Sequence, residues 1–507
     1  MNIKQAKQEI TNTLRAYLTR DDLGNYLIPT VRQRPVLLMG PPGVGKTQIM
    51  EQIAAEAGVG LVAYTITHHT RQSAIGLPFI EKRTYGGEEV SVTEYTMSEI
   101  LSSVYQLMER TGLQEGILFL DEINCVSETL APMMLQFLQC KTFGNQALPE
   151  GWLIVAAGNP PEYNKSVRDF DVVTLDRVKR IDVEEDYGVW KEYARRKNLH
   201  GAVLSYLDIK KDNFYRIENT ADGLQFATAR GWEDLSELLY AYETLGIRAD
   251  REVVGQYIQM PRIAKDFANY LEMFYKYQKT YHVEGILSGT WENITVLELR
   301  EAPFDEKLSV MGLVLSRLSE EARNTRCQDA LTDALHTSLT EFREKIADAP
   351  PLTVLDQLLW KRRTAMKQAK EAGQLDKESR DLKQREINAL EDYRQRLDRE
   401  AVAPEGAMDA VRGWFGEEVE RRKAMAMETK DMFDNAFRFL ETTFGDSQEL
   451  VIFVTEITAG YDTSWFVEQF GCDAYFRHNR ELLFDSTRHR IREEIAAAKA
   501  AEQEENT

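Results

Sequence analysis

A glycine-rich segment near the N-terminus has the residue types and spacing of a phosphate-binding loop. The pattern GxxxxGK[ST], with the residue after it, comprises Gly40, Pro41, Pro42, Gly43, Val44, Gly45, Lys46, Thr47 and Gln48. Glycines let the backbone turn its N–H groups toward phosphate oxygens, and the first turn of a following helix adds partial positive charge. We expect Lys46 to reach the β- and γ-phosphates of a nucleotide and Thr47 to offer its hydroxyl to Mg²⁺. An ordinary glycine turn is the alternative.

Two carboxylates end an apolar run further along the chain. Residues 117–122 read ILFLDE, which predicts a buried strand that ends in Asp121 and Glu122. Beside a phosphate loop, Asp121 would hold Mg²⁺, and Glu122 would polarise a water for attack on the γ-phosphate. Taken alone, such a strand usually means only that the chain leaves the core. The glycine-rich loop earlier in the chain favours the catalytic interpretation.

A polar amide follows the next apolar run. Asn159 comes directly after LIVAAG, where the carboxyl end of a parallel strand would face a bound nucleotide. Its side chain could hydrogen-bond a γ-phosphate oxygen and the attacking water, which is a catalytic role. The alternative is a turn asparagine before Pro160 and Pro161.

The first 185 residues show the pattern of a scaffold that could position these groups. Five short apolar runs without polar alternation are separated by longer stretches with helical spacing, at residues 36–39, 61–64, 117–120, 153–157 and 178–183. Such runs are typical of strands covered on both faces. The predicted fold class is therefore α/β, with a parallel five-stranded sheet between helices.

The remaining sequence is helical in pattern and divides into further segments. We expect a nucleotide-binding domain at 1–184, a helical lid at 185–275, a helical connector at 276–349, a charged helical hairpin or coiled coil at 350–403, and a C-terminal helical domain with a disordered tail at 404–507. In the charged segment both signs are interspersed around a leucine repeat. A solvated surface helix with one apolar seam is the alternative to a partner-binding coiled coil.

Together these motifs resemble the AAA+ ATPases, and within them the MoxR-type branch with its NorQ, CbbQ and GvpN relatives. The resemblance covers about residues 10–275: the loop matches Walker A, Asp121-Glu122 matches Walker B, and Asn159 matches sensor 1. Arg177 stands where the family has an arginine finger, and Arg230 where a sensor 2 arginine opens a lid helix. The loop departs from the GxPGxAKT of many MoxR-type proteins, and Thr-Ala-Arg replaces their usual Ser-Pro-Arg.

The resemblance implies an ATPase that uses ATP and Mg²⁺ and whose site is complete only in a ring, usually a hexamer. Arg177 would reach the γ-phosphate of the neighbouring subunit, while Arg230 would bind the nucleotide. Arg168 and Arg180 are rivals for the finger, and a surface ion pair is the alternative for all three. MoxR-type proteins commonly act as chaperones with a partner that bears a von Willebrand factor A domain. Predicted hairpins at 79–95 and 142–152 would contact the client or be plain surface hairpins.

The composition narrows the classes of partner. The 507 residues include 62 Lys and Arg against 82 Asp and Glu, and the net charge of −20 has the wrong sign for a protein that coats nucleic acid. Two alternatives to a chaperone-like ATPase stay open: a McrB-like DNA-directed motor, supported only by mildly basic residues 361–399, and a nucleotide-dependent scaffold. No apolar run is long enough for a membrane span, the four cysteines lack CxxC spacing, and His68-His69 have no third ligand. We expect a cytoplasmic protein.

Overall fold

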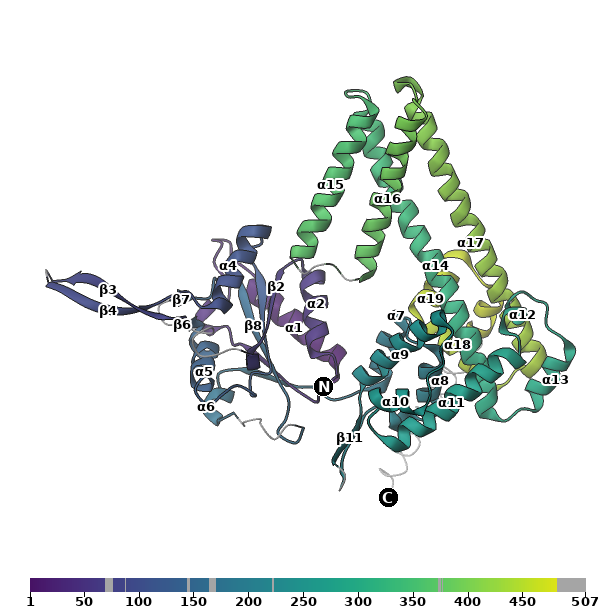
Figure 1. Ribbon diagram of the computed structural model, residues 1–507, viewed down its shortest axis with the longest axis horizontal. Helices are drawn as coiled ribbons and strands as arrows, with labels where there is room; N and C mark the ends of the chain where they lie inside the picture. Colours follow the sequence, from purple (N-terminus) through teal and green to yellow (C-terminus); the bar gives the residue numbers. More distant parts are fainter. Residues whose placement is uncertain are drawn as a thin grey trace, which may run out of the picture. The chain divides into compact units, whose positions relative to one another are not determined.

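The computed structural model describes residues 1–68, 76–86, 88–143, 146–163, 170–220, 223–372, 375 and 377–480 (Figure 1). Contacts divide the chain into two compact units. The first comprises Met1–Val189 and Gln357–Ile387, and the second comprises Trp190–Asp356 and Asn388–Thr507. The predicted disordered tail, the finger candidate Arg168 and the predicted metal alternative at His69 lie outside the described residues.

The first unit is built on a five-stranded parallel sheet in the order β2-β5-β8-β1-β9. The strands are β1 (Val36–Met39), β2 (Gly60–Thr65), β5 (Gly116–Asp121), β8 (Trp152–Gly158) and β9 (Lys179–Asp182). Each strand coincides with one of the five predicted apolar runs. All residues of β1 and β8 are buried, because these strands lie inside the sheet with both faces covered. The predicted α/β class with a parallel five-stranded sheet is therefore confirmed.

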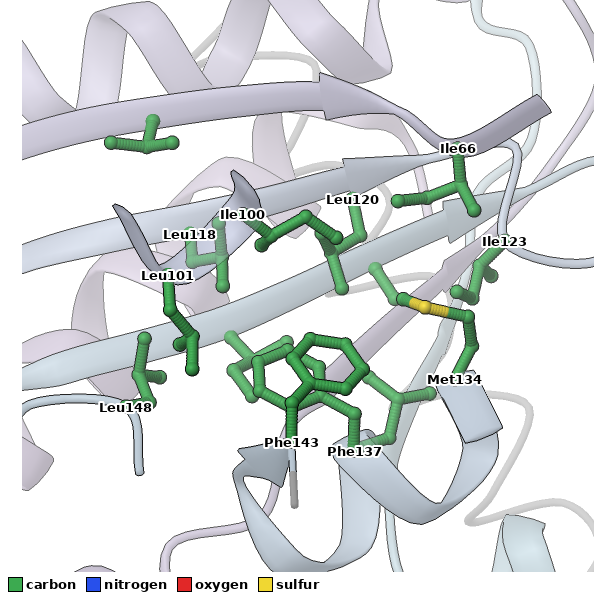
Figure 2. Packing of buried hydrophobic residues seen from close by; sticks show 14 of the residues in the cluster. Ile66, Ile100, Leu101, Leu118, Leu120, Ile123, Met134, Phe137, Phe143 and Leu148 are labelled. Atoms are coloured by element: carbon green, nitrogen blue, oxygen red, sulfur yellow. The ribbon is translucent and has the colours of Figure 1, made fainter. Parts of the chain in front are cut away.

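Helices cover both faces of the sheet. They are α1 (Ile3–Leu18), α2 (Lys46–Ala57), α4 (Glu99–Thr111) and α5 (Ala131–Cys140). Because successive side chains of a strand point to opposite faces, Val36 and Leu38 pack with α1 and α2, whereas Leu37 packs with α4 and α5. In the apolar layer that contains Leu37, Phe137 of α5 stacks on Phe143 with ring centroids 4.0 Å apart (Figure 2). The two apolar layers hold the strand ends in fixed positions.

Two antiparallel hairpins also belong to the first unit, at the places that the sequence predicts. The longer one pairs β3 (Pro78–Tyr85) with β4 (Glu88–Tyr95) and extends away from the sheet (Figure 1). All residues of β3 are exposed, among them Ile80 at 76%. The shorter one pairs β6 (Thr142–Phe143) with β7 (Gln146–Ala147). Contact of either hairpin with a client stays a prediction.

The second unit is mainly helical. Its helices are α7 (Tyr187–Arg196, which begins in the first unit), α8 (Gly201–Ile209), α9 (Ala229–Leu245), α10 (Arg251–Tyr257), α11 (Pro261–Thr280), α12 (Val283–Leu287), α13 (Asn293–Glu301), α14 (Phe304–Lys345), α17 (Ala407–Phe444), α18 (Gln448–Ala459) and α19 (Tyr461–Phe470). One antiparallel hairpin, β10 (Arg216–Thr220) and β11 (Gly223–Ala227), interrupts them. The sequence pattern predicts only helices between 185 and 275, and this hairpin departs from that prediction. The polar strand β10 contains no apolar run that would have marked it.

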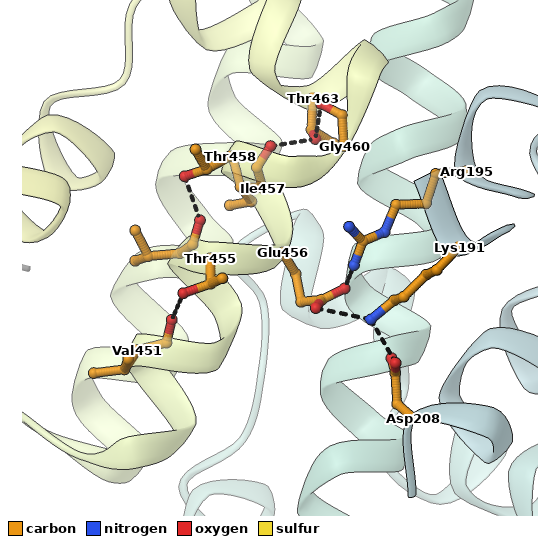
Figure 3. Close-up of polar contacts among 11 residues, drawn as sticks. Lys191, Arg195, Asp208, Val451, Thr455, Glu456, Ile457, Thr458, Gly460 and Thr463 are labelled. Atoms are coloured by element: carbon orange, nitrogen blue, oxygen red, sulfur yellow. Dashed lines mark hydrogen bonds and ion pairs between the residues drawn. The ribbon is translucent and has the colours of Figure 1, made fainter. Parts of the chain in front are cut away.

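The segment predicted as a lid packs with C-terminal helices inside this second unit. Lys191 of α7 forms ion pairs with Asp208 of α8 at 2.5 Å and with Glu456 of α18 at 2.9 Å, and Arg195 also pairs with Glu456 (Figure 3). Small residues allow α8 and α14 to approach closely: a Cβ added at Gly312 would lie 3.0 Å from the Cβ of Ser205. Segments more than 200 positions apart in sequence thus form one packed body.

The charged segment forms a pair of helices, α15 (Pro351–Glu371) and α16 (Lys377–Arg399). Arg362 pairs with Glu386 at 3.0 Å, and Arg394 pairs with Asp356 at 2.7 Å, so ion pairs join the two helices. Leu390 is buried, as the predicted apolar seam requires. The use of this helix pair as a partner-binding coiled coil stays a prediction. The boundaries of the five predicted segments also stay predictions. Across the described residues, no helix combines the length and apolar character needed to cross a bilayer.

Candidate active site

The phosphate loop joins β1 to α2, which places it at the carboxyl edge of the sheet. Gly45 is the N-cap of α2 and has φ +92°, a left-handed conformation that glycine adopts readily and other residues do not. Because the N-cap residue has no side chain, no side chain at that position competes for the first N–H groups of α2. The N–H groups of Lys46, Thr47 and Gln48 also have no partner within the helix. They form a site suited to an anionic oxygen.

The ammonium group of Lys46 joins two of the predicted motifs. Lys46 is 9% exposed, and its Nζ donates hydrogen bonds to the carbonyl oxygens of Gly40 at 2.8 Å and Pro41 at 2.9 Å. It also donates to Oδ1 of Asn159 at 2.8 Å. Asn159 follows β8, the strand that lies beside β1 in the sheet. The structure therefore brings together a lysine and an amide that are 113 positions apart in sequence.

A hydroxyl and a carboxylate meet next to the loop. Thr47 Oγ1 donates a hydrogen bond to Oδ2 of Asp121 at 3.0 Å, and Oδ1 of Asp121 accepts one from the backbone N–H of Glu122 at 2.9 Å. Hydroxyl and carboxylate oxygens are the kind of ligand that Mg²⁺ uses, usually with nucleotide phosphates and water completing its shell. The donor set of Thr47 and Asp121 thus fits this ion.

Glu122 has an uncommon backbone conformation where the chain leaves β5. Its φ is +57°, in the left-handed region that few residues other than glycine occupy. Its Oε2 accepts a hydrogen bond from Oγ1 of Thr67 at 2.9 Å, and Thr67 follows β2, the neighbouring strand. Such backbone conformations cluster at functional sites, where the surrounding structure holds them. The half-buried carboxylate can be reached by water.

Two polar residues of this site were not predicted from the sequence. Thr67 contacts Glu122, and Asn124, which is 3% exposed, donates from Nδ2 to the carbonyl oxygen of Asn159 at 2.7 Å. Neither residue belongs to a spaced motif. The available signal was a polar residue at each of two strand ends that the parallel sheet brings to the same edge.

The candidate arginines differ in their partners. Arg177 is exposed after the short helix α6 (Val172–Leu175) and donates to the side-chain oxygen of Gln139. Arg180 of β9 pairs with Asp182 at 2.8 Å. Over the part of the chain that the structure describes, neither guanidinium contacts the phosphate loop. Asp171 caps α6: its side chain accepts from the N–H of Thr174, and hydrogen bonds from Thr174 lower the pKa of this carboxyl.

Arg230 belongs to the second compact unit. It is exposed in the first turn of α9, whose N-cap residue Thr228 accepts a hydrogen bond from the N–H of Gly231 at 3.3 Å. A helix therefore begins at this position, as predicted, and its role as a lid stays a prediction. The role of Arg230 in nucleotide binding stays a prediction.

Residues 36–173 match the model of the ATPase family associated with various cellular activities (AAA). The match includes the phosphate loop, Asp121, Glu122 and Asn159, which the structure gathers at one edge of the sheet. Residues 36–173 form an AAA domain. Arg177 and the whole second unit lie outside the matched range.

No curated protein matches the chain. A crystal structure of a proposed ATPase from Cytophaga hutchinsonii is 16% identical with a TM-score of 0.22, and the similarity covers 36% of this chain and 51% of that one. The matched part thus spans about half the length of that protein.

Proposed function

We propose that this protein is a Mg²⁺-dependent AAA+ ATPase that assembles into a ring and uses hydrolysis to remodel or activate a protein client. The hydrogen bond between Lys46 and Asn159 carries the proposal, because it joins the phosphate loop to the amide expected to contact the γ-phosphate. The contact between Thr47 and Asp121 adds a fitting donor pair for the metal ion. The match of residues 36–173 to the AAA family supports the same function.

In the proposed reaction, the N–H groups of the loop bind the phosphates of ATP, and Lys46 contacts the β- and γ-phosphates. Thr47 and Asp121 would hold Mg²⁺, which when bound neutralises charge on the phosphate oxygens. Glu122 orients a water and accepts its proton, while the water oxygen bonds to the γ-phosphorus and the bond to the β-phosphate oxygen breaks. The products are ADP and inorganic phosphate. Asn159 hydrogen-bonds the γ-phosphate and the water.

The site would be completed by an arginine from a neighbouring copy of the chain. Arg177 fits this role because it is exposed and its described side-chain hydrogen bond is to the neutral amide of Gln139. Arg180 fits less well, since Asp182 already compensates its charge. A guanidinium that reaches across an interface neutralises the charge developing on the transferred phosphoryl group.

We propose a MoxR-type role for the rest of the chain. Helices α14 and α18 pack in one unit with the predicted lid, so a displacement of the lid would carry the C-terminal helices with it. These helices would recognise a partner with a von Willebrand factor A domain. The β3-β4 hairpin exposes Phe79, Ile80 and Tyr85, which would contact the client. The net charge of −20 favours a protein client over nucleic acid.

Steady-state hydrolysis with a matched pair of variants tests this function. We expect measurable turnover in the wild type and a loss of about 100-fold or more in Glu122→Gln, with ATP binding retained, because the variant lacks the group that accepts the proton. Glu109→Gln, on the exposed side of α4, should hydrolyse ATP like the wild type. A wild type that binds ATP without turnover would instead favour a nucleotide-dependent scaffold.

A further inference from the structure

Asn124 lies in the turn after β5 and links that turn to the end of β8. Two hydrogen bonds make the link: the N–H of Ile123 donates to the carbonyl oxygen of Ala157 at 2.9 Å, and Nδ2 of Asn124 donates to that of Asn159 at 2.7 Å. The first continues the backbone pairing of the sheet. The second uses a side chain that is 3% exposed, so it forms away from water and fixes the Asn159 peptide.

The other end of the Asn124 amide has a less favourable environment. Among the described residues, no donor reaches its Oδ1. This oxygen faces Gly158, where an added Cβ would lie only 2.5 Å from it, so the arrangement requires glycine at position 158. A buried amide oxygen without a donor destabilises a fold, and an apolar side chain would avoid that cost. The polar residue at this position therefore points to a role beyond packing.

The Asn124 contact continues to the phosphate loop through Asn159. The carbonyl oxygen of Asn159 accepts from Asn124, and its side-chain Oδ1 accepts from Lys46 at 2.8 Å. One residue is thus held from both its backbone and its side chain. We infer that Asn124 is a positioning residue, which orients Asn159 so that its amide faces Lys46 and the γ-phosphate of ATP. This inference rests on the proposed ATPase function, and Asn124 itself touches neither ATP nor the attacking water.

A purely structural turn residue and a positioning residue differ in what they do to nucleotide selectivity. Loss of a structural residue lowers stability and weakens ATP and ADP binding alike. Loss of a positioning residue weakens the binding of ATP more than the binding of ADP, because only ATP has the γ-phosphate that Asn159 would contact. The ratio of the two affinities therefore separates the roles. It also requires no turnover, so it can be measured in a Glu122→Gln parent.

The experiment measures the Kd of ATP and of ADP for the full chain carrying Glu122→Gln. We expect Asn124→Ala to lower the preference for ATP over ADP by roughly tenfold, which corresponds to the loss of one well-placed hydrogen bond. Asn159→Ala should have a similar effect, and the double variant should lose no more than either single one. Thr11→Val, which removes a partly buried hydrogen bond to the Lys7 carbonyl on α1, should keep the preference. An unchanged preference in Asn124→Ala would overturn the inference. A double variant whose loss equals the product of the two single losses would also overturn it.

Asn124→Asp gives a second test that preserves the shape of the side chain. A carboxylate cannot donate to the Asn159 carbonyl, whereas the protonated acid can. The preference of this variant for ATP, relative to its parent at the same pH, should therefore recover as the pH falls from about 8 to about 6, since burial raises the pKa of a carboxyl. A ratio that stays constant with pH counts against the inference. If the protein that retains Glu122 binds ATP selectively but does not hydrolyse it, only the ATPase proposal is refuted.

Discussion

The carboxylate of Glu122 is held by Thr67, and the proposed reaction requires it to meet a water instead. Its Oε2 accepts the Thr67 hydroxyl at 2.9 Å, which lowers its availability as a proton acceptor. Glu122 has a left-handed φ, and its side chain contacts this neighbour, which follows the end of β2. In the proposed reaction, the contact between Thr67 and Glu122 therefore controls the rate of hydrolysis without a change in the phosphate loop.

Removing the Thr67 hydroxyl should raise the basal rate. In Thr67→Val the carboxylate of Glu122 loses a competing hydrogen bond, and we expect kcat to increase by roughly three- to tenfold with little change in KM. Thr65→Val, at the exposed end of β2, serves as the control and should leave kcat unchanged. Steady-state kinetics checks the prediction. A lower kcat in Thr67→Val would mean that the hydroxyl holds Glu122 in its productive position.

Residue spacing indicated most of the residues that make polar contacts around the phosphate loop, but not all of them. Lys46, Thr47, Asp121 and Asn159 stand in motifs, and the structure places them within hydrogen-bonding distance of one another in pairs. Thr67 is a single hydroxyl after a strand, and many threonines in the sequence share that description. Its contact with Glu122 follows from strand order, with β2 beside β5, which the apolar runs do not specify.

Burial explains which helices and strands the sequence predicts and which it does not. The five sheet strands were predictable because burial on two faces leaves continuous apolar runs. Strands β10 and β11 were missed because they form a lone antiparallel pair whose β10 residues are partly or fully exposed, so polar residues such as Glu218 and Asn219 are tolerated there. Amphipathic helical patterns likewise reveal which face is buried but not against which helix. The packing of α8 on α14 was therefore beyond prediction.

The end of α5 contains a buried lysine whose titration should be visible in stability. Lys141 is 8% exposed, donates to the Thr30 carbonyl at 2.9 Å, and has its pKa lowered by burial from 10.5 to about 8. Between these values the unfolded chain binds more protons than the folded one. The free energy of unfolding should therefore rise with pH in this window, by up to about 3 kcal/mol, and lose that gain as the pH falls through 8.

Urea unfolding between about pH 7.5 and about pH 10 measures this effect. Lys141→Met should remove the rise contributed by this residue, because methionine does not titrate and fills a similar volume. Lys82→Met provides the control, since Lys82 is exposed on β3 and its removal should leave the pH dependence as in the wild type. An equal rise in the Lys141→Met variant would show that other groups cause it.

For the whole molecule, the division into two units matters more than the five predicted segments. The AAA domain at residues 36–173 lies in the first unit, whereas the predicted lid and the C-terminal helices share the second. The net charge of the chain is −20, whereas the proposed phosphate site contains one buried lysine and the N–H groups of the loop. In our proposal the nucleotide therefore binds at this site alone, and the net charge favours protein partners over nucleic acid.

We propose that the chain hydrolyses ATP at a site completed by Arg177 of a neighbouring copy. Mixing two inactive variants tests this proposal. Arg177→Ala retains Glu122, and Glu122→Gln retains Arg177, so a mixed ring contains some interfaces with both groups intact. We predict that each variant alone binds ATP with little turnover and that their mixture hydrolyses ATP well above the sum of the two. A mixture no more active than that sum would contradict the claim.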